Sequence, residues 1–180
     1  EVVQAMYSDP SEGPVEDLGA GEAFVPNEYA IIRNSKKSAL GTYNPYTNTV
    51  RRVGKVDAYG ITPKNAEQTF ALDALLNPEI RLVTVSGKAG TGKTLLALAA
   101  ALQAKRNYRQ IFMARPIVAL SNKDIGYLPG DIQSKLDPYM QPLFDNLAVI
   151  RNQFTERDKK NKQISELIDE EKLIISPLSY

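Results

Sequence analysis

Residues 87–94 have types and a spacing that could bind a phosphate group. They read Gly87-Lys-Ala-Gly-Thr-Gly-Lys-Thr94, which fits the phosphate-loop pattern of a glycine, four residues and Gly-Lys-Ser/Thr. Glycines let consecutive backbone N–H groups turn inward around phosphate oxygens, and the N-terminus of a following helix adds partial positive charge. Lys93 would neutralise the β- and γ-phosphates of a nucleotide, and the Thr94 hydroxyl would be a ligand of Mg²⁺.

The pattern predicts ATP and Mg²⁺ as cofactors, Lys93 as the catalytic residue and Thr94 as the metal ligand. The predicted nucleotide-binding residues of the loop are Gly87, Lys88, Ala89, Gly90, Thr91, Gly92, Lys93 and Thr94. Lys88 and Thr91 occupy variable positions, so we expect their backbone amides rather than their side chains to matter. The alternative interpretation is a glycine-rich turn that binds no ligand.

The elements around this loop must place it at the end of a sheet. Residues 81–86 are rich in β-branched side chains and predict a buried strand, and residues 93–106 predict a helix that is apolar almost all round. Residues 110–114 predict the next buried strand. Residues 81–115 would therefore form one right-handed βαβ unit of a parallel sheet.

Further helices are expected on both sides of this unit. Thr62 is a plausible N-cap with Pro63 at the first helical position, and Asn77-Pro78 would stop that helix. Three later helices are expected: a short one capped by Asp131, one opened by Asp137-Pro138, and a mixed-charge one over 156–171.

The first third of the chain is divided by charge. Residues 1–32 hold seven acidic and no basic residues, whereas residues 33–56 hold six basic and no acidic ones. The opening stretch is rich in acids, Gly and Pro and predicts a linker. Three β-type runs follow, at 29–33, 38–43 and 49–53, and predict a small meander. We expect a linker and β-rich connector over 1–57 and an α/β nucleotide-binding domain over 58–180.

Composition excludes several classes of protein. The chain has no Cys and no His, which excludes a disulfide framework, a Cys/His zinc site and His-dependent nucleophilic catalysis by this chain alone. Hydrophobic residues at 43% and charged residues at 24% are typical of a folded soluble domain. The longest apolar run, Leu95 to Leu102, is far shorter than the about 20 residues of a membrane span. We expect a cytoplasmic protein.

Four segments resemble the PhoH-like ATPases, over about residues 57–150. They are Asn65-Ala-Glu-Gln68, the phosphate loop, Ala114-Arg-Pro-Ile-Val118 and Gly126-Tyr-Leu-Pro-Gly-Asp131. The resemblance implies a RecA-like domain similar to the first lobe of superfamily 1 helicases. It also implies an ATPase coupled to RNA, with helicase and ribonuclease character, and assembly into a ring. Longer members carry an N-terminal PIN domain before a β-rich connector, which the 24–53 meander resembles.

The resemblance assigns roles to single residues. Gln68 looks like the glutamine that reads the adenine edge, and a carboxamide can both donate and accept there. Asn65, one turn earlier, is a weaker candidate. Arg115 resembles the residue of the helicase segment that touches the nucleic-acid backbone. The alternatives are an exposed helix glutamine for Gln68 and a salt-bridged structural arginine for Arg115. No chemistry follows for the Gly126–Asp131 signature.

The resemblance also predicts that this chain is a fragment. It begins at Glu1 rather than Met and ends in a strand-like neighbourhood. In the family, the acidic strand that completes the Mg²⁺ site (Walker B) would follow Tyr180, and the PIN domain would precede Glu1. Turnover is therefore expected of the parent protein, and nucleotide binding of this chain. Two alternatives stay open: a nucleotide-dependent assembly module and a small-molecule kinase.

The basic β region is a candidate platform for single-stranded RNA. Its cations are Arg33, Lys36, Lys37, Arg51, Arg52 and Lys55, and its rings are Tyr43, Tyr46 and Tyr59. Cations interleaved with stacking rings are what such a platform needs. The alternative, which the residues favour slightly, is the solvated open face of a small sheet.

Overall fold

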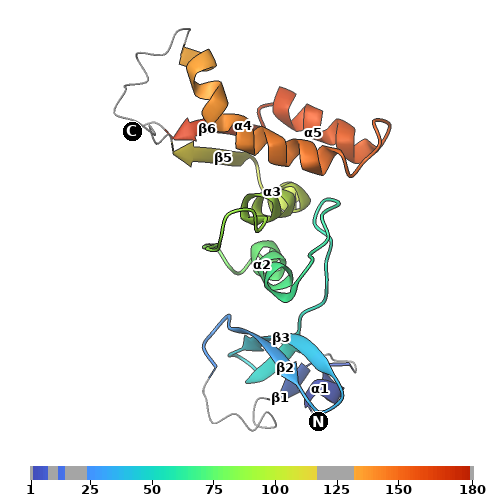
Figure 1. Cartoon of the computed structure of the whole chain (residues 1–180). Helices are drawn as coiled ribbons and strands as arrows, with labels where there is room; N and C mark the ends of the chain where they lie inside the picture. The colour runs from blue at the N-terminus through green and yellow to red at the C-terminus, as the bar shows by residue number, and fades with distance from the viewer. Residues whose placement is uncertain (1, 8–11, 15–23, 117–131, 179–180) are drawn as a thin grey trace. The chain divides into compact units, whose positions relative to one another are not determined.

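The computed structural model of the 180-residue chain describes residues 2–7, 12–14, 24–116 and 132–178. The chain forms two compact units. The first comprises Glu1–Val56 and Thr62–Asn77, and the second comprises Asp57–Ile61 and Pro78–Tyr180 (Figure 1). The Gly126–Asp131 signature lies outside the described residues.

The first unit is built on an antiparallel sheet. Its strands are β1 (Glu12–Pro14), β2 (Tyr29–Arg33), β3 (Ser38–Asn44) and β4 (Thr49–Arg52), in the order β1-β4-β3-β2. Figure 1 labels β1, β2 and β3. In the β3–β4 turn the Asn44 side chain accepts from the backbone N–H of Tyr46, and Asn48 adopts a positive φ of 51°. Asn is among the few residues that adopt this conformation readily. The predicted meander of β2, β3 and β4 is confirmed.

One face of this sheet packs against the short helix α1 (Val2–Ala5) and the residues after it. The buried cluster consists of Val3, Met6, Ile32, Ala39 and Val50, with Phe24 and Ala30 packed against it. Gly41 lies under this cluster, and a Cβ there would come within 2.5 Å of the Val50 side chain. The prediction that the opening stretch is only a linker is wrong in part, because Val3 and Met6 complete this core and β1 pairs with β4.

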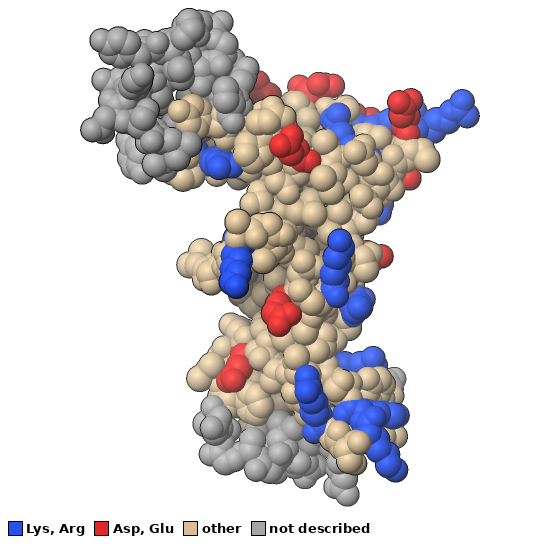
Figure 2. Space-filling view, viewed as in Figure 1, with Lys and Arg blue, Asp and Glu red and all other residues tan. Residues whose placement is uncertain are grey.

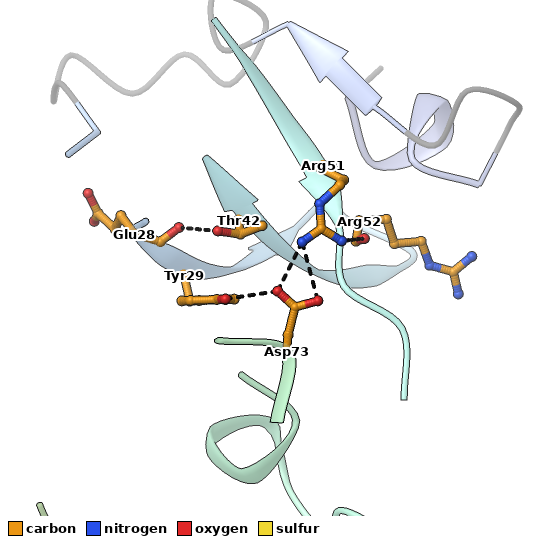
Figure 3. Close-up of polar contacts among 6 residues, drawn as sticks. All are labelled: Glu28, Tyr29, Thr42, Arg51, Arg52 and Asp73. Atoms are coloured by element: carbon orange, nitrogen blue, oxygen red, sulfur yellow. Dashed lines mark hydrogen bonds and ion pairs between the residues drawn. The ribbon is translucent and has the colours of Figure 1, made fainter. Parts of the chain in front are cut away.

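The opposite face of the sheet is joined to helix α2 (Ala66–Leu76) by polar contacts. Register places Tyr29, Thr42 and Arg51 in one row across β2, β3 and β4. Asp73 of α2 accepts a hydrogen bond from the Tyr29 hydroxyl (2.8 Å) and bonds from Arg51 Nη2 (2.9 and 3.2 Å; Figure 3). The Phe70 ring adds a tilted contact with Tyr29 at 5.1 Å. Burial and the Asp73 carboxylate together raise the pKa of Tyr29.

The start of α2 differs from the prediction. The N-cap is Asn65 rather than Thr62, and the Asn65 side chain accepts from the backbone N–H of Gln68 at 2.8 Å. Asn is among the strongest N-cap residues, so it prevails over the earlier Thr-Pro signal. The predicted end is confirmed, because Asn77 is the C-cap.

In its described residues, the second unit combines a parallel strand pair with three α-helices. Its elements are α3 (Lys93–Ala104), the 3₁₀ turn η2 (Lys105–Asn107), β5 (Ile111–Pro116), α4 (Ile132–Arg151), α5 (Lys159–Asp169) and β6 (Leu173–Leu178). β5 and β6 pair in parallel from Ile111↔Leu173 to Pro116↔Leu178. This mixed α/β architecture, together with the antiparallel sheet, is consistent with the predicted partial P-loop NTPase fold with an N-terminal meander.

The core of the second unit comes mainly from the helices, with Leu173 contributed by β6. Its buried side chains are Leu96, Leu98, Ala99, Ala100, Leu102, Met140, Leu143, Leu147, Ile150, Ile164 and Leu173. The prediction of a short helix after Asp131 and a separate one from Asp137 is wrong in part, because a single helix, α4, begins at Ile132 and runs unbroken through Asp137-Pro138. The apolar spacing at Met140, Leu143, Leu147 and Ile150 explains a long helix with one buried face. No helix among the described residues is both long and apolar enough to cross a membrane.

The segment 81–86 is not the buried strand that its composition predicts. It has no regular secondary structure, and Leu82 is 81% exposed. A strand is stabilised by its hydrogen-bonded neighbours, and no described strand pairs with this segment. The predicted βαβ unit over 81–115 therefore consists here of α3 and β5 only, and the partner of β5 is β6.

The short segment Asp57–Ile61 is fastened to the second unit through Tyr59. The Tyr59 backbone N–H donates to the Gln103 side chain (3.0 Å), and its hydroxyl donates to the backbone carbonyl of Lys160 (2.9 Å). The Lys105 ammonium donates to the Tyr59 hydroxyl at 3.2 Å, and the Phe154 ring meets the Tyr59 ring edge-on at 5.5 Å. Burial raises the pKa of Tyr59 and lowers the pKa of Lys105.

Candidate nucleotide-binding site

The loop 87–92 turns the chain directly into α3 by means of three glycines. Gly87, Gly90 and Gly92 have φ values of 152°, 76° and 84°, which residues with a side chain rarely adopt. Gly92 is the N-cap of α3 and has no side chain with which to cap it. The first amides of α3 therefore have no side-chain cap, as an anion site at a helix N-terminus requires.

Lys93 folds back over the start of this loop. Its ammonium donates to the backbone carbonyls of Gly87 (3.0 Å) and Lys88 (2.7 Å) and lies 3.4 Å from the Thr91 hydroxyl. The Thr91 hydroxyl in turn donates to the Lys88 carbonyl at 2.9 Å. The loop thus carries a positive charge held by neutral acceptors. An incoming phosphate would be a stronger partner for this charge than a neutral carbonyl.

A pocket of about 330 Å³ opens beside the loop. It is lined by Gly90, Gly92, Lys93, Thr94, Leu95 and Asn146. The Thr94 side chain is exposed there, as a metal ligand facing a nucleotide would be. Among the described residues no three acidic side chains gather into a metal site.

Asn146 was not anticipated as a site residue. It lies on α4, 52 residues after Thr94, and its side-chain amide donates to the Pro142 carbonyl at 2.6 Å. The spacing of Leu143, Leu147 and Ile150 defines the buried face of α4, and Asn146 lies beside that face. This spacing is the signal that would have found it, had α4 been predicted as one helix.

Thr91 shows that a variable position can still act through its side chain. The prediction gave a role only to the backbone amides of Lys88 and Thr91. The Thr91 hydroxyl closes the loop through its bond to the Lys88 carbonyl. The Lys88 side chain is exposed, and it is the Lys88 carbonyl that accepts the bonds described above.

Arg115 occupies the penultimate position of β5 and is exposed. The register places it beside Pro177 of the parallel strand β6. It therefore lies at the carboxyl end of the strand pair, the edge at which α/β sheets bind ligands. Among the described residues it forms no ion pair, so the alternative of a salt-bridged arginine has no described partner.

Gln68 lies in the first turn of α2 and takes part in capping it. Its side-chain oxygen accepts from the backbone N–H of Lys64 at 2.8 Å, while its own N–H donates to Asn65. Asn65 and Gln68, the two residues that the resemblance nominated for the base, thus each use a side-chain oxygen to accept a backbone N–H at the helix start. Their side chains have a structural role in addition to any contact with nucleotide.

In the structure, some residues of the predicted basic β region are buried or paired, whereas others are exposed. Arg51 is paired with Asp73 and half-buried, and Tyr59 is buried in the second unit at 3% exposure. Tyr43 stacks on Phe24 at 5.7 Å. Tyr59 therefore does not belong to the platform, because its ring packs against Phe154 and lies beside Lys105 and Lys160 rather than facing solvent. Tyr46 is 97% exposed in the β3–β4 turn.

Comparison with known proteins identifies similar chains. The PhoH-like protein family matches residues 60–180. Over 138 residues the chain is 47% identical to Protein PhoH2 of Bacillus subtilis (strain 168), covering 72% of this chain and 31% of that protein. Protein PhoH2 of Thermobispora bispora is 36% identical over 153 residues, covering 83% of this chain and 33% of that protein.

A PhoH-like protein of Synechocystis is 41% identical over 96 residues, covering 52% of this chain and 26% of that protein. The chain thus spans about a third of the length of the curated PhoH2 relatives that it matches. No solved structure matches the chain.

Proposed function

This chain belongs to the PhoH-like protein family, whose members contain a P-loop NTPase-type domain, and from this premise we propose that its loop 87–94 binds ATP with Mg²⁺. The observation that carries the proposal is the Lys93 ammonium, held over the loop by the Gly87 and Lys88 carbonyls. When a nucleotide binds, the Lys93 ammonium would only have to exchange these two carbonyl partners for phosphate oxygens.

The proposed chemistry assigns one task to each part of the loop. Backbone N–H groups of the loop and of the first turn of α3 bind the phosphate oxygens, and Lys93 neutralises charge on the β- and γ-phosphates. Thr94 holds the Mg²⁺, which supplies further neutralisation when bound. Asn146 lines the same pocket and offers an amide for a phosphate oxygen or a bound water.

The finer parts of the function are proposals that rest on the family resemblance. In the parent protein we propose ATP hydrolysis coupled to RNA, with Gln68 reading adenine and Arg115 touching the RNA backbone. The exposed position of Arg115 at the carboxyl end of β5 supports this role. A preference for ATP over GTP would be the signature of Gln68, because guanine presents the opposite pattern of donor and acceptor.

The test is equilibrium binding of a fluorescent ATP analogue with Mg²⁺ to the chain and to Lys93→Ala. A hydrogen bond to a charged group contributes about 1.5–3 kcal/mol. At about 1.4 kcal/mol per tenfold, Lys93→Ala should weaken binding roughly 10- to 150-fold. Lys88→Ala is the matched control, since it removes the same charge from the same loop and should leave affinity within about twofold.

Two competitors extend the test. Unlabelled ATP should displace the analogue at lower concentration than GTP, and Gln68→Glu should erase that difference. Equal weakening by Lys88→Ala and Lys93→Ala would mean that only the net charge of the loop matters. Absence of saturable binding by a folded chain would refute the proposal for this chain.

A further inference from the structure

The cations of the first unit gather at one end of its sheet. In an antiparallel sheet the end of β2, the start of β3 and the end of β4 lie together. Arg33 pairs with Ser38 at this end, Lys36 and Lys37 lie in the turn between them, and Arg52 pairs with Gly41. Figure 2 shows Lys and Arg side chains gathered on one side of this unit.

The β2–β3 turn holds its two lysines in a defined place. The Asn34 side chain accepts from the backbone N–H groups of Lys36 (2.9 Å) and Lys37 (2.7 Å). The backbone N–H of Asn34 donates to the Lys37 carbonyl at 2.9 Å, which closes the turn. Both lysine side chains are exposed. A polyanion would therefore meet charges on a fixed turn rather than on a loose loop.

Tyr7 places an aromatic ring among these cations. The Arg52 guanidinium lies 4.1 Å from the centre of its ring, and the Lys37 ammonium lies 5.3 Å from it. The Tyr7 hydroxyl donates to the backbone carbonyl of Ser38 at 3.1 Å, which fixes the ring against β3. The ring is nevertheless 47% exposed. Bases of single-stranded RNA stack on such rings and on arginine planes.

No described carboxylate neutralises this end of the sheet. Among the described residues, neither Arg33, Lys36, Lys37 nor Arg52 forms an ion pair. Glu28, at the opposite end of β2, accepts from the backbone N–H of Val25. Glu12 on β1 accepts from the Thr49 hydroxyl. The described acids of the sheet thus bond to other groups, and the cations of this end have no described carboxylate partner.

We propose that this basic end, defined as Tyr7, Arg33, Lys36, Lys37 and Arg52, binds single-stranded RNA. The cations contact phosphates, and the Tyr7 ring with the Arg52 plane stacks a base. An acidic peptide would use the charges but not the exposed ring. Duplex RNA keeps its bases stacked inside, where Tyr7 cannot reach them. The choice of RNA as the ligand rests on the RNA-coupled function proposed above. Binding of RNA to this surface does not require ATP in the loop 87–94.

The test measures fluorescence anisotropy of a labelled 12-nucleotide single-stranded RNA with the whole chain, without nucleotide, over a series of salt concentrations. The double variant Lys37→Gln/Arg52→Gln should weaken binding at least tenfold. It should also lower the slope of log affinity against log salt by about 1.4, since each lost phosphate contact on a single strand removes about 0.7. Tyr7→Leu should weaken binding about tenfold, and Tyr7→Phe by less than twofold.

The matched control is Lys64→Gln/Lys159→Gln, which removes two exposed charges that do not belong to the basic end and should change affinity by less than twofold. Lys36→Gln serves if the double variant fails to fold, because its side chain is exposed in the turn. Equal losses in both double variants, unchanged affinity in Tyr7→Leu, or duplex RNA binding as tightly as the single strand would overturn the proposal. Unchanged RNA affinity in Lys93→Ala would separate this surface from the phosphate loop.

Discussion

Replacing Asp73 with alanine should release α2 from the four-stranded sheet while leaving the sheet folded. The Asp73 side chain is 17% exposed and accepts bonds from both Tyr29 and Arg51 (Figure 3). By contrast, the apolar cluster on the other face, built on Val50 and Met6, does not involve Asp73. The perturbation therefore separates polar anchoring of α2 from packing of the sheet.

The magnitude follows from the two partners. The bond from the half-buried Tyr29 hydroxyl to a charged acceptor contributes about 1.5–3 kcal/mol. The Arg51 side chain is 39% exposed, so its ion pair is discounted for solvent screening to about 0.2–1 kcal/mol. Together they predict that α2 undocks about 2–4 kcal/mol more easily in Asp73→Ala.

Hydrogen–deuterium exchange read by mass spectrometry measures this directly. Amides of α2 should exchange at least about 30-fold faster in Asp73→Ala, whereas amides of β3 should keep their rates. Glu67→Gln is the control, because it removes one exposed carboxylate from the same helix. Unchanged exchange in α2, or equal acceleration in Glu67→Gln, would refute the view that Asp73 anchors the helix.

Three further predictions concern single positions. Raising the pH above about 10, the ordinary pKa of a tyrosine, should lower the thermal stability of the first unit. The reason is that the pKa of Tyr29 is raised in the folded unit, so Tyr29 ionises first in the unfolded chain. Tyr29→Phe should remove this pH dependence. Gly41→Ala should destabilise that unit by about 1–3 kcal/mol in urea unfolding, since its Cβ would meet Val50, whereas Gly54→Ala, with open space around it, should be nearly neutral. Asn146→Ala should weaken binding of the fluorescent ATP analogue about threefold to tenfold without lowering the thermal stability of the chain, and unchanged affinity would exclude Asn146 from the site.

Local signals in the sequence predicted local structure well. The turn at 87–92 and α3 follow from glycines and an apolar run that act over fewer than twenty residues, and β2 to β4 follow from β-type runs and turn residues. Gly87 and Gly92 adopt the positive φ values that glycine alone adopts readily. These features depend on glycine conformations and on the spacing of apolar residues within short segments, and both can be read from a single sequence.

Features that depend on distant partners were missed. Residues 81–86 have strand composition, but a strand requires a neighbour, and none pairs with them among the described residues. Val3 and Met6 look like part of a polar linker until the face of β3 and β4 that they cover is known. Asn146 joins the pocket only because α4 packs against α3. Composition cannot supply such pairings, because they connect residues far apart in the chain.

Charge shows how topology converts a linear pattern into a surface. The chain has a net charge of +1, which by itself predicts no attraction to a polyanion. The block 33–56 is nevertheless wholly basic among its charged residues, and two hairpins fold it back on itself. Arg51 points to α2 and is neutralised by Asp73, while Arg52, next in sequence, points to the other face and reaches Tyr7. Period-two alternation thus separates a structural arginine from one available to a ligand. Removing the charge of Arg51 should therefore lower the stability of the first unit, whereas removing the charge of Arg52 should lower its RNA affinity.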